Sequence, residues 1–537
     1  MIAKRLIAGV VPAMAMAAAS CSDLHEQPSD VQTTTSAVIA PDLRLANCQN
    51  DQRVKAGLVS ATVCAGADIF FRETFGGNGR TCGTCHPAGH NFTIDRTFIN
   101  NLPSTDPLFV FRRPELAGLE VESLIMNGGI LENVDGFSDP THRFVGRSTP
   151  HVLSLATSIA PDTTDLSTNP PRERTGWGGD GAPGTGTLRE FLTGAVKQHY
   201  PKTLARVPGP GGDFILPVDK ELDFALAFQM SLGRTNELNL EQVRMFDAQA
   251  EVGRQAYMEP ARGRCNFCHF NGGANAQLTG KNANFDTGVR FRPAFGGIGT
   301  TPDGRPIFDA GFGGANLAAP NIVSFPLFPG DMTPNGFGNN TFNTPPVIEF
   351  ADTQPGFHND TGGTPEAVVA FYSGTEFRAS QASADLVARF GTQIAITDAD
   401  AQAIARFIRT LNVALNLDMA KQRLNAAKLL ASKVLDRTFT DDHPELQKTL
   451  MTLALGDIND ALSDVLPDPI GLQPQPFYPV AQDRLGLAKD EIAAGLAAPT
   501  TQLRKDRISN AVSRVENARD TIGSNITFVL GTGNVMF

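Results

Sequence analysis

Apolar residues recur at the three- and four-residue spacing of an amphipathic helix in several stretches of the chain. Two of these stretches, 216–233 and 396–412, begin with polar residues that suit a helix start. Their apolar positions are Leu222, Ala225, Leu226 and Met230 in the first, and Ile404, Phe407, Ile408 and Leu411 in the second. This periodicity predicts two capped helices whose apolar faces pack on a core.

Helical spacing continues toward the C-terminus, for example over 419–435 and 503–522. Residues 416–537 contain no cysteine and no recognisable chemical motif. We therefore predict a helical C-terminal extension at 416–537. We expect it to pack on the domains that precede it; a surface for a partner protein is the alternative.

Within residues 60–415 the same order of features occurs twice. Each copy has a short helix, a Cys-x-x-Cys-His pentad, a long Gly/Pro-rich loop that reaches a Thr-Pro, a helix start and a closing helix. This order predicts an internal duplication. The expected fold is mainly α, with two tandem domains at 51–238 and 239–415 and long loops.

The two pentads are CGTCH at 82–86 and CNFCH at 265–269. Cys-x-x-Cys-His is the attachment pattern of c-type haem, because two thiols one turn apart can form thioethers to one haem while the next His ligates the iron. A disulfide, a redox Cys-x-x-Cys or half of a zinc site does not require the trailing His. We therefore expect two covalently attached haem c groups, with His86 and His269 as proximal ligands. The thioether residues would be Cys82, Cys85, Cys265 and Cys268.

The first residues read as an export signal. Lys4 and Arg5 precede an apolar run that is too short to span a bilayer. The run ends in Ala-Ala-Ser-Cys21, which resembles a bacterial lipoprotein box, although ordinary cleavage after the alanines is the alternative. We expect a signal peptide at 1–21, lipidation of Cys21 and a polar, flexible tether at 22–50. The mature protein would be periplasmic and anchored by lipid to the outer membrane.

The remaining two of the seven cysteines are Cys48 and Cys64. In an oxidising compartment they are expected to pair; two buried free thiols are the alternative. The net charge of −11 and the lack of a basic cluster argue against nucleic acid as a partner.

Two segments of this order resemble the bacterial di-haem cytochrome c peroxidases and the related MauG-type enzymes. They are RSTPHVLSLATS…GWGGDG…TLREF at 147–191 and TPPVIEFADTQPGFHND…TPEAVVAFY at 344–372. The resemblance covers about 60–415. It implies that electrons from a small donor protein or a quinol-linked cytochrome enter at the second haem and pass to the first, which reacts with hydrogen peroxide or another small oxidant. It also implies a calcium ion between the haem domains.

The resemblance assigns residues as well. Glu190 matches the family's acid/base glutamate at the catalytic haem; a plain helix-start glutamate is the alternative. The family's methionine ligand of the second iron is replaced here by Phe357, so His358 is expected to ligate that iron instead. The family's inter-haem tryptophan is also missing, because Trp177 stands in a Gly-rich turn.

The sixth ligand of the first haem stays open. Its candidates are His90, His142, His151, His199 and Met126, and Met258 and Met332 compete with His358 at the second. If none binds the first iron, that iron is open to peroxide or O₂, and we expect the protein to be a peroxidase-like oxidoreductase. Two alternatives remain, an electron-transfer cytochrome with both haems six-coordinate and an oxygenase that acts on an apolar substrate.

Overall fold

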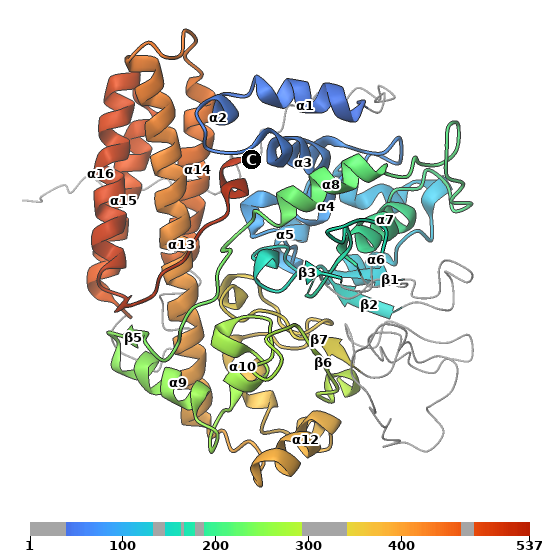
Figure 1. The fold of residues 1–537 in the computed structure, drawn as a ribbon, viewed down its shortest axis with the longest axis vertical. Helices are drawn as coiled ribbons and strands as arrows, with labels where there is room; N and C mark the ends of the chain where they lie inside the picture. The colour runs from blue at the N-terminus through green and yellow to red at the C-terminus, as the bar shows by residue number, and fades with distance from the viewer. Residues whose placement is uncertain (1–38, 133–144, 163–165, 178–186, 293–340, 463–476) are drawn as a thin grey trace, which may run out of the picture. The chain divides into compact units, whose positions relative to one another are not determined.

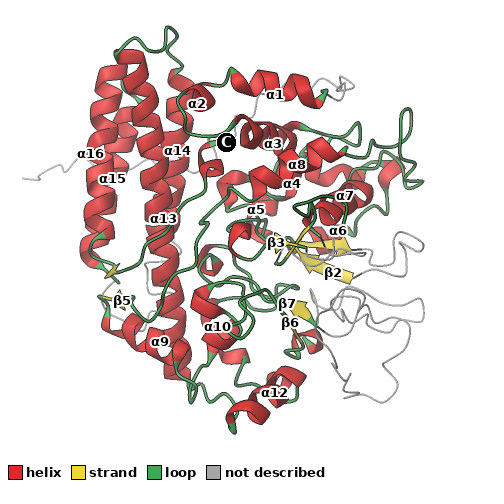
Figure 2. Cartoon of the chain, viewed as in Figure 1, coloured by secondary structure: helices red, strands yellow, loops and turns green. Residues whose placement is uncertain are grey.

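The computed structural model describes residues 39–132, 145–162, 166–177, 187–292, 341–462 and 477–537. The signal peptide with Cys21, most of the expected tether, His142 and Met332 lie outside these residues. The described part is mainly α-helical, as the sequence predicts, with a few short strands (Figure 2). None of its helices has the length and apolar composition needed to cross a membrane.

The helices follow one another along the chain as shown in Figure 1. The N-terminal helices and those of the first copy are α1 (Pro41–Gln49), α2 (Gln52–Lys55), α3 (Ala61–Arg72), α4 (Cys82–Cys85), α5 (Arg96–Asn101), α6 (Glu122–Ile125), α7 (Leu188–His199) and α8 (Asp219–Gln229). The second copy has α9 (Ala248–Met258), α10 (Pro365–Phe371), α11 (Thr375–Arg378), α12 (Gln381–Phe390) and the first part of α13 (Asp398–Leu435). Helices α14 (Pro444–Asp460), α15 (Pro479–Leu496) and α16 (Thr501–Arg519) follow.

The strands form antiparallel pairs. Strand β1 (Gly129–Glu132) pairs with β2 (Val145–Ser148), and β3 (Ala160–Pro161) with β4 (Arg174–Thr175). Strand β5 (Arg244–Met245) pairs with β8 (Gly523–Ser524), and β6 (Asn284–Phe285) with β7 (Phe342–Asn343). The β5–β8 pair joins the start of the second copy to the segment after α16.

Each copy contains the same kind of helix crossing, and in each a glycine makes the crossing possible. In the first copy, a Cβ on Gly66 of α3 would overlap the carbonyl oxygen of Phe224 in α8. In the second, a Cβ on Gly253 of α9 would overlap the carbonyl oxygen of Ala403 in α13. Only the lack of a side chain lets each pair of backbones approach so closely.

An aromatic pair lies one turn beyond each of these glycines. The rings of Phe70 and Phe228 are 5.3 Å apart and those of Tyr257 and Phe407 are 5.4 Å apart, both edge to face. Phe70 and Phe228 stand four positions after Gly66 and Phe224, the two residues of the first close contact. Tyr257 and Phe407 stand four positions after Gly253 and Ala403, the two residues of the second. The duplication read from the sequence therefore has a counterpart in the packing of α3 on α8 and of α9 on α13.

The boundary expected at residue 415 falls inside one continuous helix. Helix α13 runs from Asp398 to Leu435, because no glycine or proline interrupts it and its buried residues continue along its whole length. Its first half packs on α9 and α10, and the helix also packs on α14 and α16. The closing helix of the second copy is thus also the first helix of the C-terminal bundle (Figure 1).

The expected tether at 22–50 ends earlier than predicted, since residues 41–49 form α1. Arg44 is buried and pairs with Asp68 and with Glu73, the latter at 2.6 Å. A disulfide joins Cys48 of α1 to Cys64 of α3. These contacts hold α1 on the first copy, which polarity along the sequence alone does not reveal.

The described residues belong to one compact unit, and their buried apolar side chains form three hydrophobic clusters. One cluster combines the second copy with α13–α16. A second lies in the first copy and includes Met536, and a third, also in the first copy, is built from residues between Ile94 and Ile125. The C-terminal extension therefore packs on the copies that precede it.

The crossing at Gly253 can be tested by substitution. We expect Gly253→Ala to lower the free energy of unfolding by about 1–3 kcal/mol, because the added methyl forces α9 away from α13. Gly456→Ala in α14 is the matched control, since nothing lies within 4 Å of the position that its added methyl would take, and it should stabilise by about 0.4–1 kcal/mol. Denaturant unfolding of both variants measures the difference; equal effects would contradict the close crossing.

Candidate functional site

The first pentad forms a single helical turn, α4. Thr81 and Thr84 cap it, and the His86 amide donates to the Cys82 carbonyl at 2.9 Å. The His86 ring then lies with Nδ1 2.9 Å from the Phe92 carbonyl oxygen. A carbonyl oxygen only accepts, so Nδ1 carries the proton and Nε2 keeps a free lone pair.

The second pentad repeats this arrangement with a different partner. The His269 amide donates to the Cys265 carbonyl at 2.9 Å, and His269 Nδ1 lies 2.8 Å from the carbonyl oxygen of Pro345. This Pro345 belongs to the Thr-Pro segment of the second loop. Both pentad histidines therefore have the tautomer that a metal-ligating imidazole with a backbone acceptor adopts.

The four pentad thiols are not joined in disulfides. Burial raises the pKa of Cys82 to about 11 and the pKa of Cys265 and Cys268 to about 12. A redox Cys-x-x-Cys lowers the pKa of its reactive thiol instead, so the raised pKa of these thiols disfavours a redox dithiol.

The second pentad opens onto a large cavity. Cys265, Cys268 and His269 line it together with His358, and its empty space is about 1820 Å³ with the open solvent at its mouth included. The thiols are partly accessible because they face this cavity rather than the outer surface. Most of the wall is apolar, including Phe285, Val289, Phe342, Phe350, Val369 and Ile408.

The backbone of His358 is held by the first copy. The Ser148 amide donates to the His358 carbonyl at 2.8 Å, and the Ser148 hydroxyl donates to the Phe357 carbonyl at 3.1 Å. The His358 ring stacks on Phe342 with centroids 4.0 Å apart. Phe357, at the position of the family's methionine, lies against Phe371 with ring centroids 5.0 Å apart. The cavity thus contains His358 as well as the pentad, and its role as an iron ligand stays a prediction.

Two residues of the first copy also line this cavity, His151 and Trp177, whose rings are 4.7 Å apart. The Leu153 amide donates to His151 Nδ1 at 3.3 Å, so the proton of the neutral ring is on Nε2. Burial lowers the pKa of His151 to about 4, against the nearby Glu349 carboxylate, which raises it, and with the charges of Arg234 and His86, which lower it further. The ring is therefore neutral near pH 7. His151, a candidate ligand of the first iron, lines the cavity of the second pentad. Its ring also lies near enough to His86 of the first pentad for the two side chains to interact electrostatically.

The other described candidates for the first iron have partners of their own. His199 bonds to the buried Glu120 at 2.9 Å, and Glu120 also pairs with Arg80. His90 stacks on Phe98 and lies 3.5 Å from Asp95. Arg112 contacts the sulfur of Met126 at 3.7 Å. Met258, a competitor of His358 at the second iron, accepts from Arg254 at 3.5 Å.

Glu190 lies in the first turn of α7, half-buried, where its amide donates to the hydroxyl of Thr187 at 3.1 Å. The other end of α7 touches the first pentad, since the Tyr200 hydroxyl donates to Cys82 Sγ at 3.4 Å. Ten residues of helix separate the two positions, roughly 15 Å. Glu190 is outside the cavity of the second pentad, and it stands on a helix that is anchored at the first.

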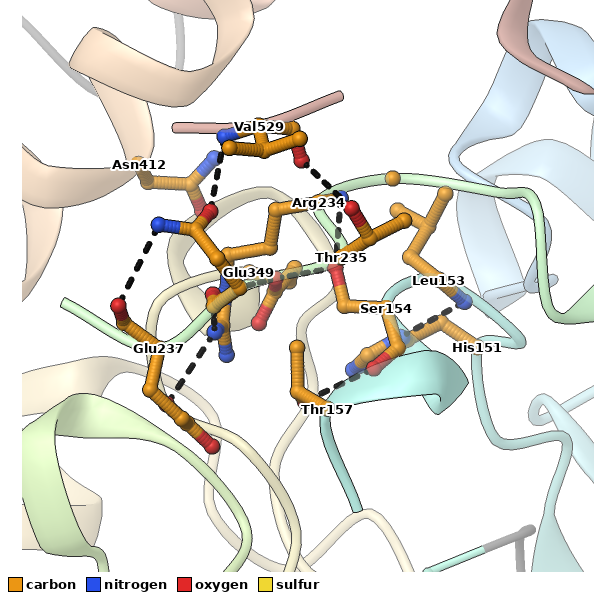
Figure 3. A network of polar contacts seen from close by, with 12 residues as sticks. His151, Leu153, Ser154, Thr157, Arg234, Thr235, Glu237, Glu349, Asn412 and Val529 are labelled. Atoms are coloured by element: carbon orange, nitrogen blue, oxygen red, sulfur yellow. Dashed lines mark hydrogen bonds and ion pairs between the residues drawn. The ribbon is translucent and has the colours of Figure 1, made fainter. Parts of the chain in front are cut away.

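A buried polar network joins the two copies next to this cavity (Figure 3). Arg234 and Glu349, both fully buried, form an ion pair at 2.9 Å. Ser154 donates to Glu349 at 2.6 Å and accepts from the Arg234 amide at 3.0 Å. Arg234 also pairs with Glu237 at 3.2 Å. A calcium ion between the copies stays a prediction, because the described side chains show no cluster that could hold a metal.

Sequence reasoning missed His151 and Trp177 as walls of the second cavity. They come from the first copy, so only the packing of the copies brings them to the second pentad. The chain matches no protein-family model, and no curated protein and no solved structure is significantly similar to it. Its function therefore has to be argued from the site itself.

Proposed function

We propose that the protein is an exported di-haem c-type cytochrome with tandem haem domains and a peroxidase-like oxidoreductase activity. The observation that carries this proposal is the pair of Cys-x-x-Cys-His pentads in which each histidine donates Nδ1–H to a backbone carbonyl, so that the lone pair of the neutral ring is on Nε2. A redox dithiol or a zinc site needs neither the histidine nor this tautomer. A haem thioether site needs both.

The residues around the second pentad fit a haem. Cys265 and Cys268 would hold it covalently, His269 would bind its iron, and the apolar wall would exclude water from it. His358, in the same cavity, supports a second imidazole ligand. Haem supplies one-electron redox chemistry and, where an axial position is open, a binding site for a small oxidant.

His151 would serve the second haem without ligating it. Its Nδ1 accepts from Leu153, so its Nε2–H is available as a donor to a group in the cavity. A tautomer change would be needed for Nε2 to bind iron, at the loss of the Leu153 bond. His269 and His358 would both hold the second haem, which would supply the electron-entry step.

The first haem would be the reactive one. His90, His199 and Met126, three of the candidates for its sixth ligand, have partners of their own. In the proposal, none of these three would bind the first iron. Glu190 would take a proton from one oxygen of hydrogen peroxide and return it to the other. The two electrons needed to break the O–O bond would come from the electron-donor protein through the haems.

An electron-transfer cytochrome without peroxidase activity is the second candidate. Glu190 sits in ordinary helix-start geometry with Thr187, which a purely structural glutamate would also show. Both candidates share the same compartment: we propose export to the periplasm, a lipid anchor at Cys21 and a small electron-donor protein as partner.

The haem content tests the core of the proposal. Purified, denatured protein should retain two haems per chain in a pyridine haemochrome assay, because thioether bonds survive unfolding. Cys265→Ala/Cys268→Ala should reduce the count to one. Haem that acidified solvent extracts, or a count of zero, would refute it.

The second haem's ligands are tested by a matched pair of histidine variants in the same cavity. His358→Ala should convert a low-spin ferric signal to high-spin while the haem count stays at two. His151→Ala should leave the low-spin signal intact, because the Nε2 proton keeps this ring off the iron. Electron paramagnetic resonance distinguishes them, and the opposite pattern would make His151 the ligand.

Glu190→Gln separates the two candidate functions. The amide keeps the shape but cannot accept a proton near neutral pH, so the reaction with hydrogen peroxide should slow by about 10²–10⁴-fold. Stopped-flow mixing of the ferric protein with peroxide measures this rate. If wild type is equally slow and its first haem is low-spin, the protein is an electron carrier.

A further inference from the structure

The segment after α16 returns across both copies to the first pentad. Its strand β8 pairs with β5, and the Val529 carbonyl accepts from the Thr235 amide at 2.7 Å. Further on, the buried Asn534 accepts from the Gly233 amide at 2.7 Å and donates to the Gly233 carbonyl at 3.1 Å. Figure 1 shows this red segment leaving the bundle and reaching α3.

At its end, Phe537 joins the aromatic cluster of the first copy. Its ring lies 5.0 Å from Phe92, 5.7 Å from Phe71 and 6.3 Å from Phe228, in each case edge to face. This cluster touches the pentad directly, since a Cβ on Gly83 would lie 2.6 Å from the Phe71 ring. Phe92 also supplies the carbonyl that accepts from His86 Nδ1.

The C-terminal bundle fixes Phe537 in this place. Arg423 of α13 donates to the Asn534 carbonyl at 3.1 Å and holds its guanidinium 5.5 Å from the Phe537 ring. Arg423 is itself paired with Asp457 of α14, and both side chains are buried. A chain of contacts thus runs from the bundle through Arg423 and Phe537 to Phe92 and His86.

We infer that the C-terminal region tunes the first haem, with Phe537 as a positioning residue for His86. The inference rests on the proposed function, because it assigns His86 as the proximal ligand. The hydrogen bond from Nδ1 sets the basicity of the ligating imidazole and through it the reduction potential of the iron. Phe537 packs on the residue whose carbonyl accepts that bond and so holds the bond at its length.

The test compares Phe537→Ala with Phe528→Ala, which removes the same ring from the same segment without a ring contact to the pentad cluster among the described residues. Spectroelectrochemistry of the full chain should show an upward shift of the first haem's potential in Phe537→Ala. The second haem's potential should not change, and Phe528→Ala should shift neither. Phe537→Leu, which keeps most of the packing, should restore the wild-type potential in large part.

A second measurement does not depend on haem. Within residues 87–93, the amides of Phe92 and Thr93 donate hydrogen bonds to carbonyls of the same loop. Amide hydrogen exchange of this loop should be faster in Phe537→Ala and unchanged in Phe528→Ala. If the pyridine assay finds no haem in wild type, the proposed function fails while the exchange result still decides the coupling. Equal exchange and equal first-haem potentials in both variants would overturn the inference.

Discussion

The ion pair between Arg234 and Glu349 is the interaction on which the arrangement of the two copies depends. Both side chains are fully buried, and two charges removed from water are stable only when hydrogen bonds satisfy them. Ser154, Glu237 and the backbone of Asn236 provide part of those bonds, while Arg234 Nη2 and Glu349 Oε2 have no hydrogen-bond partner among the described residues. Loss of one partner from such a pair typically costs about 3–5 kcal/mol, so the segments that carry them are strongly held together.

Those segments position the candidate site. Ser154 follows His151 by three residues, and Glu349 directly precedes Phe350 in the wall of the second cavity. The network therefore holds His151 of the first copy in the wall of the cavity that contains the second pentad. In the same region, Ser148 holds the backbone of His358. The second cavity is a joint product of both copies rather than a property of one.

The C-terminal bundle plays the corresponding part for the first pentad. It grows out of the second copy as a continuation of α13, and its last segment packs on the aromatic cluster beside His86. Each pentad thus depends on chain segments far from it in sequence. In the proposed function, this reciprocal dependence would allow the two haems to differ although their attachment motifs are alike.

Local features of the sequence determined the helical class, the repeated order of elements and the two pentads. Helical periodicity, caps such as Thr187 and Thr397, and the spacing of Cys82, Cys85 and His86 depend on neighbours within a few residues, so the pattern itself reveals them. The Cys48–Cys64 pairing also followed from a count of cysteines.

The tertiary structure alone decided which distant residues meet. The acceptor of His269 lies 76 residues away at Pro345, His151 joins the cavity of the other copy, and Phe537 packs on Phe92. It also decided that α1 is ordered on the first copy and that α13 passes through residue 415 without a break. Apolar and polar positions along a chain mark which side of an element is buried, but they carry no record of its partner. Which elements pack together is determined by the close helix crossings at Gly66 and Gly253 and by the pairing of the buried charges of Arg234 and Glu349.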